Sequence, residues 1–502
     1  MKVATRNPRC HVRIISLEYG EILAETVRPA LKRVSVHRRM GTAAGSFQLL
    51  LLPRRTNTPG IPLDWRDVLA PMDYVEISIE IAPRLPTVIM RGFVDTVSEQ
   101  GQIGERGASR TVQVTGRDFG KLLLITKLYY LDGVQQVVIF EKWRQAFLSL
   151  FAWNGGKPPP PEHPPLPRNV NTNAPLYSPQ DLLQGIFDAF YLPQQDLILQ
   201  QYPTVPPIRF FPVTNALNNT NERELSTIAP DALSLNWTPF TDVWMLLKQY
   251  QHQPWRELYV TDMEEGPRLI YRPSPWMDVN GQFVFPDMEG GHMGTMPTHQ
   301  VSEGDIAEYS LSHSDEYAKN FFFTYTDEFG ALAQMVKTVG PHEGIVSDPL
   351  KGNPYLVGYQ ATDRAKEKRA DYNVMGFRLH EVRTPYLDFD HRTGEEQIGV
   401  RLKAVREQGL QENLKLARAY DHGGVLEFGA FVLKGDERIG VGHYVEIADA
   451  ALLRLGTGAR YYVEGVSHLF QQGSVEGDGV FLTTAEVSRG RGHMMRKGLV
   501  SR

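Results

Sequence analysis

The sequence has almost no cysteine. Its 502 residues include only one, Cys10, so no disulfide can form within the chain. Cys-x-x-Cys and His-Glu-x-x-His motifs are missing as well, which removes the commonest sequence patterns of zinc sites. A chain without disulfides fits assembly in a reducing cytoplasm, and we interpret Cys10 as a thiol without a functional role.

Long apolar runs are also lacking. No stretch approaches the roughly 18–20 apolar residues that a helix needs to span a bilayer. The basic first 16 residues lack the apolar run and the small-residue cleavage site of a secretion signal. We therefore expect a protein that has no membrane partner and stays inside the cell that makes it.

Neither sign of charge dominates. The chain has 53 Lys and Arg against 58 Asp and Glu, for a net charge of −5, and so lacks the basic excess typical of tight nucleic-acid binding. A content of 42% hydrophobic and 22% charged residues is ordinary for a globular protein. The length exceeds what a single core supports and predicts two to four domains.

Two distant stretches share a strand pattern. Residues 72–119 alternate apolar and polar side chains in three pieces separated by turn residues, which predicts antiparallel strands. The first piece places Val75, Ile77, Ile79 and Ile81 on one face. Residues 442–490 repeat the pattern, so that the chain is predicted to hold two related β modules.

The details of the two stretches also match. DYVEI at 73–77 corresponds to HYVEI at 443–447, and we align RGFVDTVS at 91–98 with VEGVSHLF at 463–470. Gly92 and Val114 are 22 residues apart, as are Gly465 and Val487. Three matches in the same order indicate a degenerate internal repeat.

Other elements are predicted before and between these stretches. A β-hairpin is expected at 31–52, followed by a helical turn at 65–69 that Asp64 caps. A second hairpin is expected to turn at 263–267, and residues 277–300 are predicted to form a long loop. The helices predicted from apolar periodicity are 141–153, 178–192, one beginning near 242, 361–382 and 402–420.

Several clusters of reactive side chains resemble parts of active sites, but none completes one. His292 and His299 have no carboxylate or cysteine at ligand spacing, which favours solvated histidines over a metal site. Glu264 and Glu265 are neighbours on a predicted turn, where side chains point apart into water. The segment 312–315 contains serine, histidine and aspartate, but catalytic triads normally take their members from distant segments.

Glycine-rich loops and aromatic stripes also have plain interpretations. GTAAGS at 41–46 lacks the lysine of a phosphate loop, and GERG at 104–107 is weaker still. Phe321, Phe323 and Tyr325 share one face of a predicted strand without the interleaved Arg and Lys of a base-stacking surface. We therefore predict no catalytic, cofactor-binding or metal-binding residue, and a structural protein rather than an enzyme.

Eight segments in chain order share one resemblance. They are 11–23, 34–53, 65–77, 88–99, 112–124, 253–276, 312–323 and 438–490. Together they cover most of the chain, and they resemble the baseplate hub proteins of contractile phage tails. This family includes the tail late-control protein and is related to the N-terminal region of the type VI secretion spike. The Pro-rich insert at 157–168 and the region 331–400 match nothing in it.

The resemblance implies a function and partners. Members carry two tail-tube-like β-barrels per chain and form homotrimers, so that six barrels match the hexameric tail tube and the threefold axis matches the trimeric central spike. The chain would be a virion protein of the tail baseplate, made in the host cytoplasm, with tail tube, central spike and baseplate wedge proteins as partners. DNA would pass through the lumen without specific binding, and the family supplies no catalytic residue or cofactor to assign.

A domain plan and a fold class follow. Residues 1–126 would form the first tube-like β-barrel module, and 127–300 an inserted helical and β domain with the Pro-rich segment 157–168. Residues 301–502 would form the second tube-like module, with an insert at about 331–400 and a basic tail at 491–502. The predicted fold class is α+β, mostly antiparallel β, with two tube-like barrel modules and inserted α/β domains.

Two other classes of function remain open from the sequence. One is a cell-wall glycan hydrolase, which would lose activity on replacement of a single carboxylate. The other is a glycan- or receptor-binding tail module, which would bind sugars through exposed Trp and Tyr and would not associate with a tube. A phage-tail-like bacteriocin is a close variant of the hub interpretation.

Overall fold

The computed structural model describes the β modules and most of the elements between them. The predicted helix at 141–153, the Pro-rich segment 157–168, nearly all of 331–400 and the tail beyond 491 lie outside the described residues. The described residues are 7–53, 64–104, 107–127, 179–212, 242–277, 283–284, 297–314, 319, 321–325, 378–383, 415–416, 419–420, 426–449, 458–473 and 479–491.

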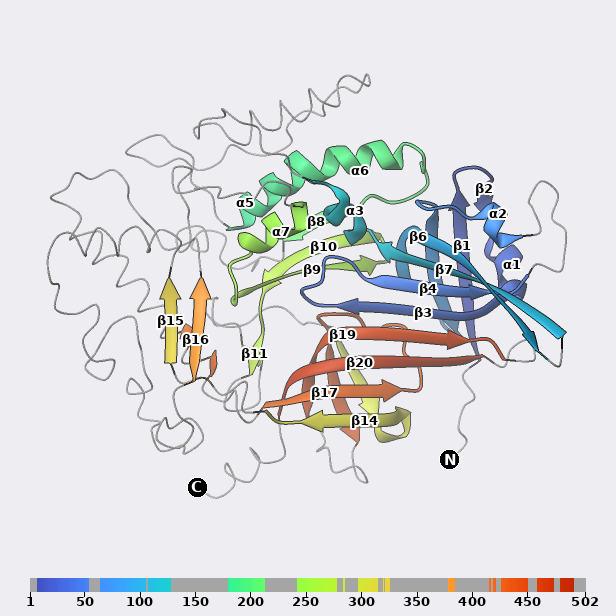
Figure 1. The fold of residues 1–502 in the computed structure, drawn as a ribbon. Helices are drawn as coiled ribbons and strands as arrows, with labels where there is room; N and C mark the ends of the chain where they lie inside the picture. The colour runs from blue at the N-terminus through green and yellow to red at the C-terminus, as the bar shows by residue number, and fades with distance from the viewer. Residues whose placement is uncertain are drawn as a thin grey trace, which may run out of the picture.

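One sheet of 13 strands dominates the molecule (Figure 1). All its strand pairs are antiparallel except β13·β18, so the predicted mostly antiparallel β class, with few helices, is confirmed. Its first-module strands are β1 (Pro8–Ser16), β2 (Gly20–Ile22), β3 (Leu31–Arg39), β4 (Ser46–Leu51), β5 (Tyr74–Ile81), β6 (Thr87–Gly104) and β7 (Gly107–Asp118). Its second-module strands are β13 (Thr298–Ser302), β14 (Ile306–Ser312), β17 (Leu426–Leu433), β18 (Tyr444–Asp449), β19 (Arg460–Gln471) and β20 (Val480–Arg491).

The two modules have the same strand order, as the internal repeat predicts. The first runs β3-β4-β7-β6-β5-β1, and the second runs β14-β17-β20-β19-β18-β13. Irregularities fall at matching places: β3 shifts register between Leu31 and Arg33, and β14 shifts between Ile306 and Glu308. The strand β1 pairs antiparallel with β5, whereas its counterpart β13 runs parallel to β18.

The register of the predicted repeat was wrong in β6 and β19. In its pairing with β7, strand β6 has the unpaired bulge residue Asp95, and in its pairing with β20, strand β19 has the unpaired bulge residue Glu464. Superposing the bulges aligns 91–98 with 460–467, three residues before the segment chosen from the sequence. RGFVDTVS then lies on RYYVEGVS, with Arg, Val, Val and Ser at identical positions. The equal spacing of 22 residues was a coincidence. In the corrected register Val94 and Val463 correspond, but Val94 pairs with Gly116, 22 residues later, whereas Val463 pairs with Val487, 24 residues later.

In the corrected register, corresponding residues of the two modules also make corresponding side-chain contacts. Glu76 bonds Arg91 at 2.9 Å across β5 and β6, and Glu446 bonds Arg460 at 2.7 Å across β18 and β19. The aromatic pair Tyr74 and Phe93, 5.9 Å between ring centroids, has its counterpart in Tyr444 and Tyr462 at 5.7 Å. The modules therefore share cross-strand pairs, the local unit of sheet stability.

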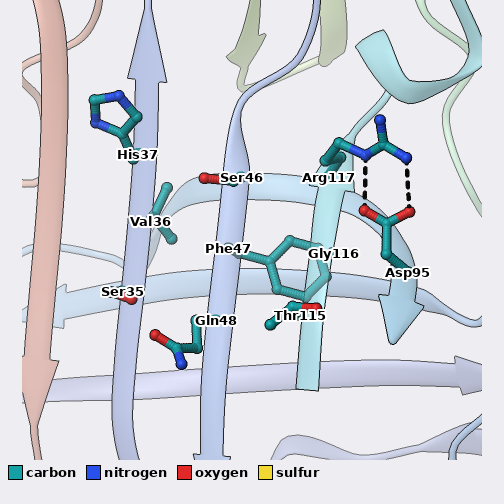
Figure 2. Close-up of a pocket in the computed structure, with 10 residues that line it drawn as sticks. All are labelled: Ser35, Val36, His37, Ser46, Phe47, Gln48, Asp95, Thr115, Gly116 and Arg117. Atoms are coloured by element: carbon teal, nitrogen blue, oxygen red, sulfur yellow. Dashed lines mark hydrogen bonds and ion pairs between the residues drawn. The ribbon is translucent and has the colours of Figure 1, made fainter. Parts of the chain in front are cut away.

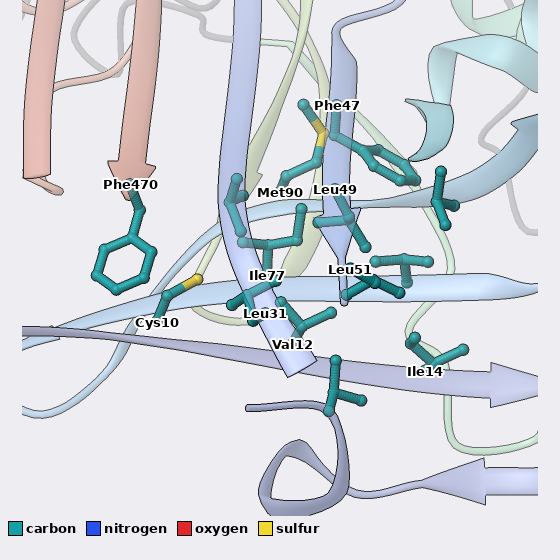
Figure 3. Close-up of a cluster of buried hydrophobic side chains, with 14 of the residues drawn as sticks. Cys10, Val12, Ile14, Leu31, Phe47, Leu49, Leu51, Ile77, Met90 and Phe470 are labelled. Atoms are coloured by element: carbon teal, nitrogen blue, oxygen red, sulfur yellow. The ribbon is translucent and has the colours of Figure 1, made fainter. Parts of the chain in front are cut away.

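The modules are joined edge to edge. The strands β3 and β19 pair antiparallel over seven residue pairs, from Gly465·Arg39 to Gln471·Arg33. Phe470 of β19 and Phe481 of β20 belong to the same buried apolar cluster as Cys10, Val12 and Ile77 of the first module (Figure 3). Module two thus completes the core of module one, and Cys10 is an ordinary core residue within it.

An inserted unit of helices and a hairpin packs on the joined sheet (Figure 1). The predicted helix 178–192 continues further, because a π-helical turn at Phe187–Tyr191 joins it to α6. The hairpin β9·β10 has two buried faces: Leu258 and Leu269 pack with the helices, while Tyr259 and Ile270 pack with module two. The elements are α3 (Gly120–Ile125), α5 (Pro179–Ile186), α6 (Leu192–Leu199), β8 (Arg209–Pro212), α7 (Val243–Gln249), β9 (Arg256–Met263) and β10 (Gly266–Pro273).

The remaining short elements correct two predictions. The predicted loop 277–300 contains strand β12 (Phe283–Val284), paired with β11 (Trp276–Met277), and the start of β13. The predicted helix 361–382 ends instead in strand β16 (Leu379–Arg383), which runs parallel to β15 (Phe321–Tyr325). Long-range pairing therefore overrides the local helical pattern at Leu379–Val382.

Two short helices belong to the first module, of which one was predicted from the sequence. The Asp64 side chain accepts a hydrogen bond from the Arg66 backbone at the start of α2 (Trp65–Val68), confirming the predicted cap. A turn of helix, α1 (Ala24–Val27), precedes β3. Within the predicted 402–420 helix, residues 415–416 and 419–420 are described and are helical. Among the helices that the structure describes, none is long and apolar enough to cross a membrane.

Candidate assembly surface: the open face of the joined sheet

The joined sheet has one buried face and one open face. Along β3, Val34 and Val36 are buried in the core, whereas Ser35 and His37 alternate with them and are half-buried. Residues directly opposite each other on paired strands lie on the same face of the sheet. Ser35 lies opposite Gln48 of β4, and Gln48 lies opposite Thr115 of β7, so all three are on the open face. One face therefore remains outside the core along eight strands, from β14 to β6.

The open face carries mostly hydroxyl and amide groups. Side chains such as these hydrogen-bond water without attracting or repelling phosphate strongly. Partly exposed Leu50, Leu469 and Val432 are interspersed among them. The polar uncharged residues on this face are Ser35, Ser46, Gln48, Thr96, Ser98, Gln100, Gln113, Thr115, Ser310, Ser312, Ser467, Gln471 and Thr484.

Charges on the open face are largely paired. Arg117 donates two hydrogen bonds to Asp95, at 2.7 and 3.1 Å, and Lys121 lies 2.9 Å from the same carboxylate. Burial opposes ionisation of Asp95, but the bonds from Arg117 and Lys121 outweigh it and lower the pKa of Asp95. Arg39 lies 3.6 Å from Glu486 across the module junction. Arg33 of β3 lies on the same face, opposite Gln471 and Leu50, and is exposed. The face therefore has two arginines in ion pairs and one arginine, Arg33, that belongs to neither pair.

A shallow hollow of about 370 Å³ lies on this face over β3, β4, β6 and β7 (Figure 2). Gly116 forms part of its floor, where a Cβ atom would overlap the ring of Phe47. His37 lines the hollow, and its Nδ1 lies 2.8 Å from Ser467 Oγ. The carboxylate among the lining residues, Asp95, is held by Arg117 and Lys121 and does not orient His37, so these groups do not form a triad.

The described residues of two clusters that the sequence suggested take part in a turn and in strand contacts. Glu264 and Glu265 form the exposed β9·β10 turn, where Glu265 bonds Arg268 at 2.5 Å. The Ser312 hydroxyl bonds the Phe428 carbonyl at 3.4 Å, and the neighbouring His313 lies 3.7 Å from Glu427. These contacts tie β14 to β17 and do not assemble a catalytic group.

The other candidates are equally structural. Residues 41–45 lie between β3 and β4, and Ser46 begins β4. Gly104 and Gly107 are the paired end residues of β6 and β7. Phe322 is buried in a small cluster with Trp255 and Trp276. His292, Asp315 and the side chains of Phe321, Phe323 and Tyr325 lie outside the described residues. In the part of the chain that the structure describes, no three His, Cys, Asp or Glu side chains gather as a metal site would require.

His299 pairs with a histidine that the sequence did not single out. Its Nε2 lies 2.9 Å from Nδ1 of His443, and the two rings stack at 5.1 Å. The same Nδ1 accepts a hydrogen bond from the Gly440 backbone. Burial, together with the nearby His299, lowers the pKa of His443 to about 3, and burial also lowers the pKa of His299. Both rings are therefore neutral at pH 7.

Sequence analysis also missed a buried charge cluster between module one and the hairpin. Asp262 of β9 accepts a hydrogen bond from the Arg38 side chain and another, at 2.9 Å, from the Arg91 backbone. Arg38 bonds Asp118 as well, at 3.2 Å. Burial raises the pKa of Asp118 to about 6, against the opposing effect of Arg38. No local signal marks this cluster, because Arg38 and Asp262 are far apart in the sequence.

A second buried cluster joins the hairpin to module two. Arg272 of β10 donates to Tyr462 at 2.5 Å and to the Gly442 carbonyl at 3.0 Å, and lies 3.3 Å from Glu257. Tyr462 in turn donates to Glu257. The hairpin therefore contacts both modules through buried, hydrogen-bonded charges, which fix its position relative to the joined sheet.

Comparison with known proteins gives distant structural likeness only. No protein-family model and no curated protein matches the sequence. A tail protein from Neisseria meningitidis MC58 is similar over 95% of this chain and 96% of its own, with 11% identity and a TM-score of 0.43. The 43 kDa tail protein of prophage MuSo2 from Shewanella oneidensis has 10% identity and a TM-score of 0.41, over 95% of this chain and 98% of its own.

A third similar structure is a Francisella PdpA–VgrG complex. It has 8% identity and a TM-score of 0.42, over 96% of this chain and 57% of its own. These three structures are thus a tail protein, a prophage tail protein and a VgrG complex. At TM-scores below 0.5, none of these likenesses decides the fold or the function of this chain.

Proposed function

We propose that this chain is a structural baseplate hub protein of a contractile tail. Three copies form a ring that joins the hexameric tail tube to the trimeric central spike. The observation that carries the proposal is the presence of two modules with one strand order, joined edge to edge in a single sheet. It adds to the ordered sequence resemblance, which covers most of the chain.

Symmetry explains why such a chain suits this position. Three chains with two similar modules each present six similar modules to a sixfold partner, while the ring keeps true threefold symmetry for the spike. We propose that each module closes as a tube-like β-barrel and that the boundaries are 1–126, 127–300 and 301–502, with the second module beginning slightly earlier, at the first residue of β13, Thr298. Baseplate wedge proteins would contact the outside of the ring.

The open face has the chemistry expected of a lumen that passes DNA. Its side chains are mainly uncharged, and two of its three β3 and β7 arginines, Arg39 and Arg117, are paired with carboxylates, whereas Arg33 is exposed outside these pairs. A wall with unpaired basic groups would retain phosphate, because each such contact adds favourable, salt-dependent binding. We therefore propose that this face lines the lumen, that DNA passes without specific binding, and that the hub has no catalytic residue or cofactor.

The test is the mass of the purified protein by light scattering, with negative-stain images of the same peak. A mass near three times 56.8 kDa, seen end-on as a ring with a central hole, is the expected result. A monomer that also fails to associate with purified tube and spike proteins would overturn the proposal. Hydrolysis of peptidoglycan, lost on replacement of one carboxylate, would favour a glycan hydrolase instead.

A further inference from the structure

We infer that strand β6 of one copy pairs antiparallel with strand β14 of the next copy, in the register that β3 and β19 use within the chain. This inference rests on the proposed ring and specifies the surface that closes it. The partner is a second copy of this chain. The two surfaces differ, so the contact is head-to-tail, the kind of interface that generates rings.

Two strand edges lack a partner among the described strands. The strand β14 ends the sheet and pairs only with β17. The strand β6 pairs with β5 through Phe93, and beyond that residue it pairs only with β7. An unpaired edge is a template for another strand, and natural proteins usually cover or block such edges. These two edges lie at opposite ends of the same eight-strand run.

The internal junction supplies the template. In the matched modules, β6 corresponds to β19 and β14 corresponds to β3. The contact β19·β3 therefore has one possible repetition, between β6 and β14. Among the described strands, none pairs with the outer edge of either strand. Repetition of one junction around the ring would place every module in the same kind of contact.

The matching bulges fix the register of the repetition. Aligning Asp95 with Glu464 places Ser98 at the position of Ser467, and the β3 and β14 bulges place Ser312 at the position of His37. Because Ser467 lies opposite His37, Ser98 lies opposite Ser312 of the next copy. In the same way, the pair Leu469·Ser35 becomes the pair Gln100·Ser310.

The side chains at these positions suit a strand junction. Ser98, Gln100, Ser310 and Ser312 are small or flexible polar groups on the open face, and no like charges lie opposite one another. Ser98 and Ser312 can form the side-chain contact that Ser467 forms with His37 at 2.8 Å in the internal junction. The predicted contact would continue the open face from one copy to the next.

The backbone hydrogen bonds of the β3·β19 junction identify the residue pairs whose side chains lie closest. The Met40 backbone donates to Glu464 at one end of β3·β19, and the Gln472 backbone donates to Lys32 at the other. Residue pairs with and without mutual backbone hydrogen bonds alternate along an antiparallel ladder. Counted from either end, His37·Ser467 is a pair without such bonds, the kind in which side chains are closest. Ser98·Ser312 and Gln100·Ser310 inherit this geometry, which suits a disulfide.

Disulfide mapping tests the pairing directly. In a Cys10→Ala background, one variant carries Ser98→Cys with Ser312→Cys, and a second carries Gln100→Cys with Ser310→Cys. Under mild oxidation, we expect most of each variant to run as covalent dimers and trimers on a non-reducing gel and as monomers after reduction. A control with Ser98→Cys and Ser310→Cys is offset by two residues and should stay largely monomeric.

The outcomes separate this inference from the proposed ring. Trimers by light scattering that do not cross-link through either matched pair would overturn the β6·β14 pairing and leave the ring intact. Cross-linking in the offset control alone would overturn the register. A protein that is monomeric by light scattering and does not cross-link would overturn both the pairing and the ring.

Discussion

Asp262 holds together two buried arginines from a module that is distant in the sequence. Its side chain is 2% exposed and accepts bonds from Arg38 and from the Arg91 backbone. We expect Asp262→Ala to lower the free energy of unfolding by about 3–5 kcal/mol, because it removes the buried carboxylate that Arg38 and Arg91 share and leaves each of them with one other carboxylate, Asp118 and Glu76. Urea unfolding followed by tryptophan fluorescence measures the change.

Glu265 provides the matched control. It also bonds an arginine, Arg268, but its side chain is 79% exposed. Glu265→Ala removes the same charge and should cost at most about 0.5 kcal/mol, as exposed pairs do. Equal midpoints for the two variants would contradict the role given to the buried cluster.

His443 makes the second module sensitive to acid. An unfolded histidine titrates near pH 6.5, whereas burial lowers the pKa of folded His443 to about 3. Between these values the unfolded chain binds the proton more readily, so stability is present above pH 6.5 and falls as the pH decreases toward 3. We expect a loss on the order of 2 kcal/mol from this residue between pH 7 and pH 4.5.

His443→Asn should reduce that loss. The Asn Oδ1 atom can replace Nδ1 as acceptor for the Gly440 backbone but does not become protonated in this range. Urea midpoints at pH 7 and pH 4.5 give the comparison. The control His11→Asn removes a partly exposed histidine of module one and leaves His443 in place, so it should keep the wild-type acid sensitivity. An equal response of both variants would assign the sensitivity elsewhere.

At the scale of elements, β14 depends on one glycine of its neighbour. Gly429 in β17 has a φ of +155°, and a Cβ atom there would overlap the carbonyl oxygen of Ser310 in β14. We expect Gly429→Val to loosen β14 from β17, because backbone atoms cannot yield as a flexible side chain can. Faster hydrogen exchange of the β14 amides and loss of trimer are the expected results.

Gly304, which precedes β14, is the comparison for this variant. Its nearest neighbour to an added Cβ would be Ser302 Oγ at 3.8 Å, an ordinary contact. Gly304→Ala should therefore keep the wild-type exchange and oligomeric state. Loss of the trimer in both variants would show that β14 responds to any change nearby and not to the Gly429 contact.

The strands could be predicted from the sequence, but their joining could not. Alternation at Val75–Ile81 or Val34–Val36 has a period of two and is visible locally. The pairing of β3 with β19 joins residues more than 400 positions apart and has no local pattern. The repeat was recognised in the wrong register because the bulges at Asp95 and Glu464 shift the strand pairing. A bulge is defined by the residues opposite it on the partner strand, so the sequence of one strand does not reveal it.

The contacts of the buried polar residues could not be predicted from the sequence. Nearby residues with reactive side chains were compared with one another, whereas the buried contacts join residues from distant segments. Arg38, Asp118 and Asp262 could not be grouped beforehand, because charged residues in one-dimensional sequence carry no sign of burial. The histidine pair escaped for a related reason: His299 was compared with nearby His292, whereas its partner is His443 on a parallel strand.

For the whole molecule, the position of the open face can be tested by adding charge to it. The triple variant Gln48→Lys, Ser467→Lys and Thr484→Lys places three ammonium groups per chain on that face. In the proposed ring they line the lumen, so we expect linear duplex DNA to bind with an affinity that falls steeply with salt. Closed-circular DNA of the same sequence should not bind, because only a free end can thread a closed ring.

Charge added elsewhere distinguishes the lumen from a general basic surface. The control replaces exposed Leu23, Leu85 and Met245 with lysine, outside the open face. It should bind neither form of DNA more tightly than the wild type does at roughly 0.15 M salt. Equal binding of circular and linear DNA by the open-face variant would place that face on the outside of the assembly.

The β3·β19 junction also affects how the ring would respond to concentration. Three of the six module junctions in the proposed ring lie within single chains, where the effective concentration of one module near the other does not depend on expression level. Only the three remaining junctions depend on protein concentration. The equilibrium amount of ring would therefore vary with the third power of the chain concentration, whereas a ring of six separate modules would vary with the sixth power. Dilution would open the ring at β6 and β14 and leave each pair of modules together.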